Sequence, residues 1–284
     1  MQISRIPAAL FAAVLLGVTA SPAPSSSFFQ TVGRDALRTG VAPGLAVAVA
    51  LHGAIVYEGG FGEADVSKHI PAAAHTPFAI GSLTKQFTAA AILLLAREHR
   101  VALDDPLSKY VPSLPNASGI TIRMLLNQTS GLHNYPLLSE HAWPTRGDIP
   151  LAKIVAILAT DPTDFKPGTK WAYSNANYAA LAAVVEKAGG EPFGVFLQKH
   201  IFGPLNMKDS GFGYTAQRRG NVAVGYANGA PEQPALSLDL YSGAGGVVAS
   251  ADDLARWDIS LMRASLLPQP MIAQMWNTGR LIGG

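Results

Sequence analysis

The sequence of 284 residues contains no cysteine. Disulfide bonds, thiol catalysis and metal sites built on thiolates are therefore excluded for it. Charge is also scarce: 14% of the residues are charged, and 21 basic residues nearly balance 19 acidic ones without a basic run or stripe. Because surfaces that bind nucleic acid need clustered lysine and arginine, we expect no nucleic-acid partner.

Recognisable metal and phosphate motifs are lacking as well. The seven histidines are scattered, with no His-Glu-x-x-His pattern that would place two imidazoles on one helix face. The stretch GAGG at 243–246 has no strand–loop–helix fingerprint around it, so we expect a tight turn there rather than a phosphate-binding loop. Neither a metal nor a cofactor is expected.

Long apolar runs are missing after the first twenty residues. The alanine- and leucine-rich stretches at 89–96 and 179–185 are too short to cross a bilayer. Residues 1–20 combine an early arginine, an apolar run and a small-residue end, which predicts a secretory signal peptide cleaved after Ala20 or Ala23. An N-terminal membrane anchor is the alternative. We expect a periplasmic or secreted protein.

The mature part is expected to begin with a flexible leader at 21–29 and to continue as one domain over 30–284. The hydrophobic fraction of 49% is enough to bury a large core. Two apolar runs separated at His52-Gly53 predict a β-hairpin whose strands are covered on both faces. Residues from about 82–240 predict mostly helices. The fold class is therefore α+β, with an antiparallel sheet lobe and a mostly helical lobe.

Two helix boundaries carry particular signals. Gly189-Gly190 predicts the end of a helix over about 176–188, and Ser250 predicts the cap of a later one. A short helix containing TIRMLL is expected to continue to Gly131.

Ser82 and Lys85 form the first candidate for chemistry. They lie three residues apart at the start of a predicted helix, so their side chains share one face. A serine hydroxyl needs a base to become nucleophilic, and a lysine can be that base when a dry surrounding and the positive helix end favour its neutral form. Backbone N–H groups at the helix start can also face a developing oxyanion. Alternatively, Ser82 caps the helix and Lys85 extends to solvent.

Tyr173-Ser174-Asn175 forms the second candidate. It lies in a proline- and glycine-bounded loop directly before a helix, where side chains can project into a cleft. The tyrosine could relay protons and Asn175 could hold a substrate amide. Alternatively, the tyrosine is a buried aromatic and Asn175 a helix cap. Tyr226-Ala227-Asn228 has the same spacing, but no helix follows it, so we rank it well below the first motif.

Six blocks together resemble a known family. PGLAVAVALHGAIVYEGGFGEAD, FAIGSLTKQFTAAAILLL, LLNQTSGL, PGTKWAYSNANY, IFGPLNMKDSGF and SGAGGVVASADDLARW occur in this order. They resemble the serine β-lactamase-related hydrolases, which include class C β-lactamases, DD-peptidases and related esterases. The resemblance covers roughly residues 30 to 275, and its tyrosine motif is similar to that of class C.

The resemblance implies roles for four residues. Ser82 would be the acylated nucleophile, Lys85 its proton acceptor, Tyr173 the partner in proton transfer and Asn175 a substrate-positioning side chain. The implied reaction is two-step acyl transfer without metal or cofactor. The carbonyl could belong to a β-lactam, a D-Ala-D-Ala-type or other peptidoglycan-derived peptide, or a small ester. Loop 133–150 would shape the cleft, with Tyr135, Trp143 and Trp171 as lining candidates or buried packing residues.

One part of the family pattern is not found. The third motif, Lys-Thr-Gly or a histidine-containing equivalent, lies on a strand near the C-terminus of the family, and Asn277-Thr278-Gly279 falls too early to replace it. We therefore expect that C-terminal strands and a helix are missing from this chain, which leaves the sheet with open edges and an uncovered apolar face. Three interpretations follow: an incomplete copy of an active hydrolase, a non-catalytic binding or scaffold protein, or an enzyme completed by another chain. The oligomeric state stays open.

Overall fold

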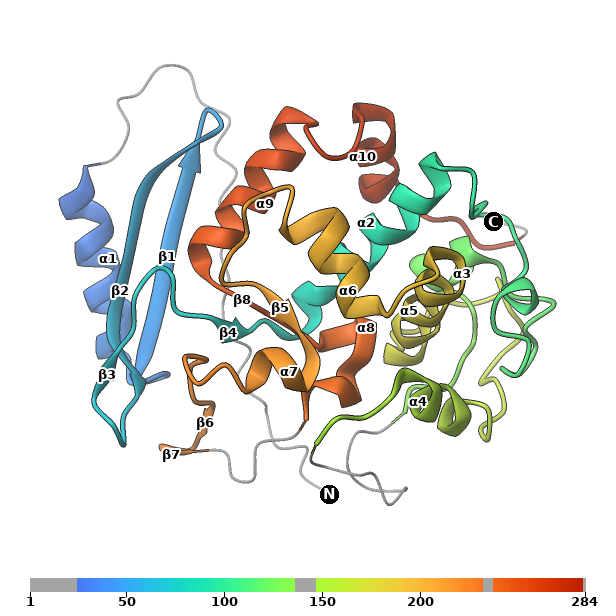
Figure 1. The fold of residues 1–284 in the computed structure, drawn as a ribbon, viewed down its shortest axis with the longest axis horizontal. Coiled ribbons are helices and arrows are strands. Elements are labelled where there is room, and N and C mark those ends of the chain that lie inside the picture. The colour runs from blue at the N-terminus through green and yellow to red at the C-terminus, as the bar shows by residue number, and fades with distance from the viewer. Residues whose placement is uncertain (1–24, 136–146, 232–236, 283–284) are drawn as a thin grey trace.

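In the computed structural model, residues 25–135, 147–231 and 237–282 are described. A three-stranded antiparallel sheet at one side of the molecule is flanked by helices, and a larger helical lobe fills the rest (Figure 1). This agrees with the predicted α+β class. The predicted signal peptide lies outside the described residues.

The sheet is built on the predicted hairpin. β1 (Gly44–Leu51) and β2 (Ala54–Asp65) pair antiparallel across His52-Gly53, and β3 (Ile70–Pro71) adds to the far side of β2. His52 and Gly53 have φ of 51° and 78°, the left-handed pair that a two-residue hairpin turn needs. No strand of the described residues pairs with the outer edge of β1, so the expected open edge is present there.

A helix covers each face of this sheet, as Figure 1 shows. α1 (Ser26–Arg38) packs on one face, and α9 (Ala251–Arg263) packs on the other. The strands are nevertheless only partly buried, since every residue of β1 is half-buried and β2 alternates between half-buried and exposed over most of its length. Helices therefore cover both faces of the sheet, as predicted, but they leave the strands less buried than the prediction implied.

Two element boundaries in the structure differ from the prediction. α1 begins at Ser26, where Ser25 Oγ accepts from Phe28 N–H, so residues 26–29 are helical rather than a flexible leader. α3 (Ile122–Leu126) ends before Gly131, because Gln128 already takes the left-handed backbone conformation that terminates a helix.

The helical lobe is centred on α2 and α5. Among the large side chains of its core, Phe87 of α2 contacts Trp257 of α9 and Phe202, with ring centroids 4.9 and 5.5 Å apart. Trp257 also donates its indole N–H to Gln86 Oε1 at 2.6 Å. The other helices of the described residues are η1 (Gly81–Leu83), α2 (Thr84–Arg97), η2 (Leu107–Lys109), α4 (Leu151–Leu158), α5 (Asn175–Gly189), α6 (Phe193–Leu197), the π-helix η3 (Gln198–Phe202), α7 (Gly213–Gln217), η4 (Leu238–Tyr241), α8 (Ser242–Gly245) and α10 (Gln269–Trp276). A second, short sheet has the strand order β4–β8–β5 and consists of β4 (Phe78–Ala79), β8 (Val247–Ala249) and β5 (Gly211–Phe212). A separate two-stranded sheet pairs β6 (Tyr226–Ala227) with β7 (Ala230–Pro231).

No helix in the described ranges has the length and apolarity that crossing a bilayer requires. Nor do the described residues contain a group of three or more histidine, aspartate or glutamate side chains suited to a metal ion.

Candidate active site

Two hydrogen bonds to β8 hold the start of α2 in place. Ile80 N–H donates to Val247 O at 3.1 Å, and Val247 N–H donates to Thr84 Oγ1 at 3.1 Å. Between these two anchors the chain turns through Gly81, whose φ of 52° lies in the left-handed region that glycine adopts without strain. Ser82 follows in η1 with its side chain exposed. The turn thus presents the serine hydroxyl at a rigid helix start.

Ser82, Lys85 and Tyr173 meet within hydrogen-bonding distance. Lys85 Nζ donates to Ser82 Oγ at 3.1 Å, and Ser82 Oγ lies 2.7 Å from the Tyr173 hydroxyl. Lys85 Nζ also lies 4.9 Å from the centroid of the Tyr173 ring. The structure therefore brings together two motifs that are about ninety residues apart in the chain.

Lys85 has two further acceptors, which are fixed in the protein. Its ammonium donates to Asn175 Oδ1 at 3.0 Å and to Ala244 O at 2.7 Å. Burial lowers the pKa of Lys85 below the usual lysine value, while the contact with Tyr173 acts in the opposite direction. Deprotonation of Lys85 is thus easier here than in water, although three acceptors surround the charged form.

This geometry orients the amine. A neutral lysine has two N–H bonds and one lone pair. If Asn175 Oδ1 and Ala244 O keep the two N–H bonds, the lone pair points toward Ser82 Oγ. Deprotonated Lys85 can then accept the Ser82 proton. The arrangement suits nucleophilic attack by a serine on a carbonyl.

The Tyr173 side of the site is fixed by the start of α5. Ser174 Oγ accepts from Ala176 N–H at 3.2 Å and so provides the N-cap of α5, while Asn175 is the first residue of that helix. Tyr173 is 44% exposed, so its ring forms part of the surface of the site rather than the core. The alternative interpretations of Tyr173 as buried packing and of Asn175 as the helix cap do not hold.

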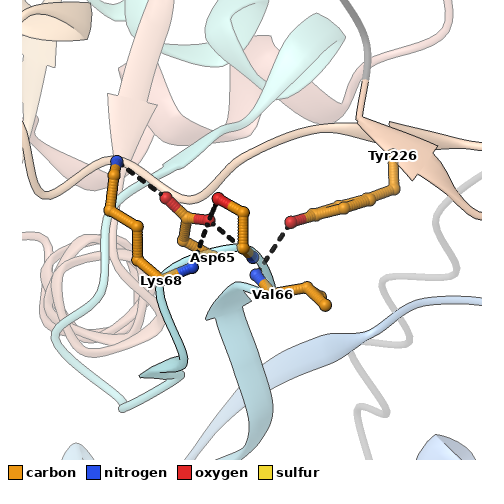
Figure 2. Close-up of polar contacts among 5 residues, drawn as sticks. Asp65, Val66, Lys68 and Tyr226 are labelled. Carbon is orange, nitrogen blue, oxygen red and sulfur yellow. Dashed lines mark hydrogen bonds and ion pairs between the residues drawn. The ribbon is translucent and has the colours of Figure 1, made fainter.

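The second Tyr-x-Asn motif has a structural contact instead. Figure 2 shows the Tyr226 hydroxyl directed at the end of β2, where it accepts from Val66 N–H at 2.8 Å. In the adjacent turn, Asp65 accepts from Ser67 and Lys68, and these contacts lower its pKa to about 2. Tyr226 thus connects the β6–β7 hairpin to the end of β2, a contact that the sequence did not predict.

The three aromatic residues predicted as candidates for lining the cleft differ in where they lie. Tyr135 is 1% exposed and donates its hydroxyl to Leu240 O at 3.1 Å, so it is a core residue, and burial raises its pKa. Trp171 is 65% exposed, two residues before Tyr173. Trp143 lies outside the described residues.

Sequence reasoning missed several groups that position the site. Ala244 contributes only its backbone oxygen, which no residue pattern reveals, although it lies in the GAGG stretch. That stretch is a short helical turn, α8, and Thr88 Oγ1 also donates to Gly243 O there at 2.7 Å. Gln128 and Asn134 accept hydrogen bonds from the backbone around Tyr173. The block LLNQTSGL was the available signal for Gln128, but no role was assigned to it.

A hollow of about 530 Å³ lies beside α2 and has Lys85 in its wall, whereas Ser82 is not among the residues that line it. Its wall includes Tyr178 and the segment 274–280, so Asn277-Thr278-Gly279 lines the same hollow as Lys85. Three cations, Lys85, Arg123 and Arg280, line the hollow, and none of the described lining residues is acidic. Asp104 neutralises Arg123 through two contacts at 2.8 and 2.9 Å, which leaves Arg280 as an exposed charge at this wall.

The chain is similar to known proteins over most of its length. The family profile described as Beta-lactamase matches residues 32–281. PbpX from Bacillus subtilis (strain 168) is 33% identical over 233 residues, which cover 80% of this chain and 57% of PbpX. Penicillin-binding protein 4* from the same strain is 28% identical over 91% of this chain and 60% of its own length. The chain thus spans less than two thirds of these relatives.

A solved structure is similar over most of the described fold. D-amino acid amidase from Ochrobactrum anthropi SV3, in complex with L-phenylalanine amide, superposes with a TM-score of 0.74 at 27% identity. The match covers 87% of this chain and 72% of the amidase chain.

Proposed function

Because this chain belongs to the β-lactamase family, we propose that it is a serine hydrolase that works through a covalent acyl-enzyme at Ser82. The observation that carries this proposal is the placement of Lys85 Nζ among Ser82 Oγ, Asn175 Oδ1 and Ala244 O. A lysine with a lowered pKa beside an exposed serine hydroxyl is the activated pair that acyl transfer requires.

The proposed reaction has two steps. Ser82 Oγ attacks the carbonyl carbon and forms a C–O bond, its proton passes to Lys85, and the carbonyl oxygen becomes an oxyanion. The oxyanion collapses, the bond from carbon to the leaving atom breaks, and the proton passes through Lys85 and the Tyr173 hydroxyl to that leaving atom. Water then attacks the Ser82 ester, releases the acid and returns the hydroxyl proton. Asn175 orients Lys85 through its Oδ1 and faces the substrate amide.

We further propose that the substrate is an amide or lactam that carries a carboxylate. Arg280 gives the hollow beside Lys85 a positive wall, and β-lactams and C-terminal peptides both bear a carboxylate whereas a simple ester does not. The penicillin-binding name of one relative and the amidase name of the structural neighbour support an amide carbonyl. A peptidoglycan-derived peptide ending in D-Ala-D-Ala and a penicillin both meet this description.

A pair of penicillins tests the substrate class. Second-order acylation rates are measured by intact mass for benzylpenicillin and for its methyl ester, with wild type and Arg280→Gln. The free acid should react faster by about 2- to 5-fold, the size of an exposed ion pair, and Arg280→Gln should remove the difference. Equal rates for acid and ester in wild type, or a preference for a neutral p-nitrophenyl ester, would contradict the carboxylate preference.

We also propose that the protein is exported. The support is the residue pattern of the first twenty positions, together with the kinds of relatives found. Expression of the chain in a bacterium followed by N-terminal sequencing should give a mature protein that begins at Ser21 or Pro24. An unprocessed Met1 in the soluble cell fraction would contradict export.

A further inference from the structure

Backbone N–H groups on both sides of Tyr173 are held by the loop that follows α3. Ala172 N–H donates to the backbone oxygen of Gln128 at 3.1 Å, and Ser174 N–H donates to Gln128 Oε1 at 2.9 Å. One residue farther on, Asn175 N–H donates to Asn134 Oδ1 at 2.8 Å. A single residue, Gln128, therefore holds the chain immediately before and immediately after Tyr173.

Gln128 adopts a backbone conformation that glycine usually provides. α3 ends in a Schellman arrangement, in which Thr129 N–H donates to Met124 O at 2.8 Å and Gln128 N–H donates to Leu125 O at 3.2 Å. The φ of Gln128 is 63°, a left-handed value that is unfavourable for residues with a side chain. Glycine would end this helix with less strain. The glutamine at this position therefore indicates that its side chain has a role that glycine could not fill.

The Gln128 side chain is fixed by a second donor. It is 8% exposed, and its Oε1 accepts from Asn177 Nδ2 as well as from Ser174 N–H. Asn177 is 1% exposed and is itself hydrogen-bonded to Ser130 Oγ. Because both partners are N–H donors, the oxygen of the Gln128 amide must face them. The buried cluster thus directs one acceptor at the Tyr173 loop.

We propose that Gln128 is the positioning residue for Tyr173 and that it acts on catalysis without touching the substrate. This inference rests on the proposed acyl-transfer function. Tyr173 is 44% exposed, so packing restrains its ring only partly, and the backbone on either side must supply the remaining order. The 2.7 Å contact between Tyr173 and Ser82 Oγ depends on that order, since proton transfer requires close approach of the two oxygens.

Three variants separate positioning from stability. Gln128→Met has a similar volume but no acceptor, whereas Gln128→Glu keeps an acceptor oxygen for Ser174 and Asn177. Ser130→Ala is the matched control, because it disturbs the same buried cluster without a bond to residues 172–175. The acylation rate constant at saturating benzylpenicillin, the apparent affinity and the melting temperature are measured for each. Amide hydrogen exchange of the peptide 171–176 gives a readout that needs no activity.

The expected results differ among the variants. Gln128→Met should lower the acylation rate constant by about 10- to 100-fold with little change in affinity, and should speed exchange in 171–176. Gln128→Glu should restore most of the rate, and Ser130→Ala should lower the melting temperature without either effect.

Two results would overturn the positioning role. One is faster exchange or slower acylation that merely follows the melting temperature in all three variants. The other is unchanged exchange of 171–176 in Gln128→Met. If wild type itself forms no acyl-enzyme, the proposed function fails, while the exchange measurement still decides whether Gln128 orders the Tyr173 loop.

Discussion

Lys85 is the residue at which burial and charge conflict most directly. It is the first-turn lysine of an apolar helix, half-buried, and its pKa is lowered chiefly because burial disfavours the ammonium. Three oxygen acceptors offset part of that cost. The lowered pKa means that Lys85 loses its proton at a lower pH than a free lysine does, and a general base needs the neutral amine.

The rate of acylation should therefore rise with pH through the lowered pKa of Lys85. Below that pKa the ammonium has no lone pair, and above it the amine accepts the Ser82 proton. Lys85→Arg should lose about 10²- to 10⁴-fold in acylation rate at every pH, because guanidinium does not deprotonate in proteins. Stopped-flow acylation from pH 5 to pH 10 provides the check. A rate that is independent of pH in wild type, or an active Lys85→Arg, would exclude the lysine as base.

The variant Tyr173→Phe should lower the acylation rate without lowering the stability of the fold. The hydroxyl contacts Ser82 Oγ, and the ring is 44% exposed. We expect an acylation rate lower by about 10²-fold and an unfolding free energy within about 0.5 kcal/mol of wild type. Urea denaturation alongside the acylation assay measures both. Full acylation activity in the variant would remove Tyr173 from the proton pathway.

At the scale of elements, caps determine where the helices that support the site begin. Ser250 Oγ, fully buried, accepts from Asp253 N–H at 3.1 Å at the start of α9. Asp252 and Asp253 in the first turn add negative charge at the positive helix end. α9 covers one face of the β1–β2 hairpin and carries Trp257 into the core, so its start affects both lobes.

Ser250→Ala should lower the unfolding free energy by about 1 kcal/mol, because one helix N–H loses its acceptor. Ser265→Ala, at an exposed serine just after the same helix, should change it by less than about 0.5 kcal/mol. Urea unfolding curves for the two variants give the comparison. Equal effects would mean that the cap does not stabilise α9.

Elements with local causes could be predicted from the sequence. The hairpin turn at His52-Gly53, the Ser250 cap and the left-handed end of α5 at Gly190 all depend on a residue and its immediate neighbours. The pairing of Ser82 with Lys85 also follows from helix geometry alone.

The contacts that complete the site could not be predicted in the same way. Ala244 O reaches Lys85 across 159 residues, and Gln128 reaches Ser174 across 46. A backbone oxygen carries no residue identity, and the left-handed Gln128 violates the usual glycine preference at a helix end. The joining of Ser82 to Tyr173 rested on resemblance to a family, since no local rule brings two distant motifs together.

At the scale of the whole molecule, burial is uneven between the two lobes. α2 and α5 each contain nine buried residues, whereas every residue of β1 is only partly buried. The outer edge of β1 has no strand partner in the described ranges. Amides without a partner and with few buried neighbours open at low free energy.

Amide hydrogen exchange should therefore be slowest in α2 and α5 and clearly faster in β1 and α1. Mass spectrometry of peptides from these four elements measures the order. Protection of β1 equal to that of α2 would mean that the edge is covered in solution, which contradicts the fold as described.

The proposed function requires that Ser82 forms a covalent acyl-enzyme with the help of Lys85 and Tyr173. The most direct measurement is the intact mass of the purified protein after incubation with benzylpenicillin, with Ser82→Ala as the control and peptide mapping of the adduct. We expect one added penicilloyl group on the peptide that contains Ser82 and none in Ser82→Ala. The absence of an adduct on folded wild-type protein, or an adduct that persists in Ser82→Ala, would contradict it.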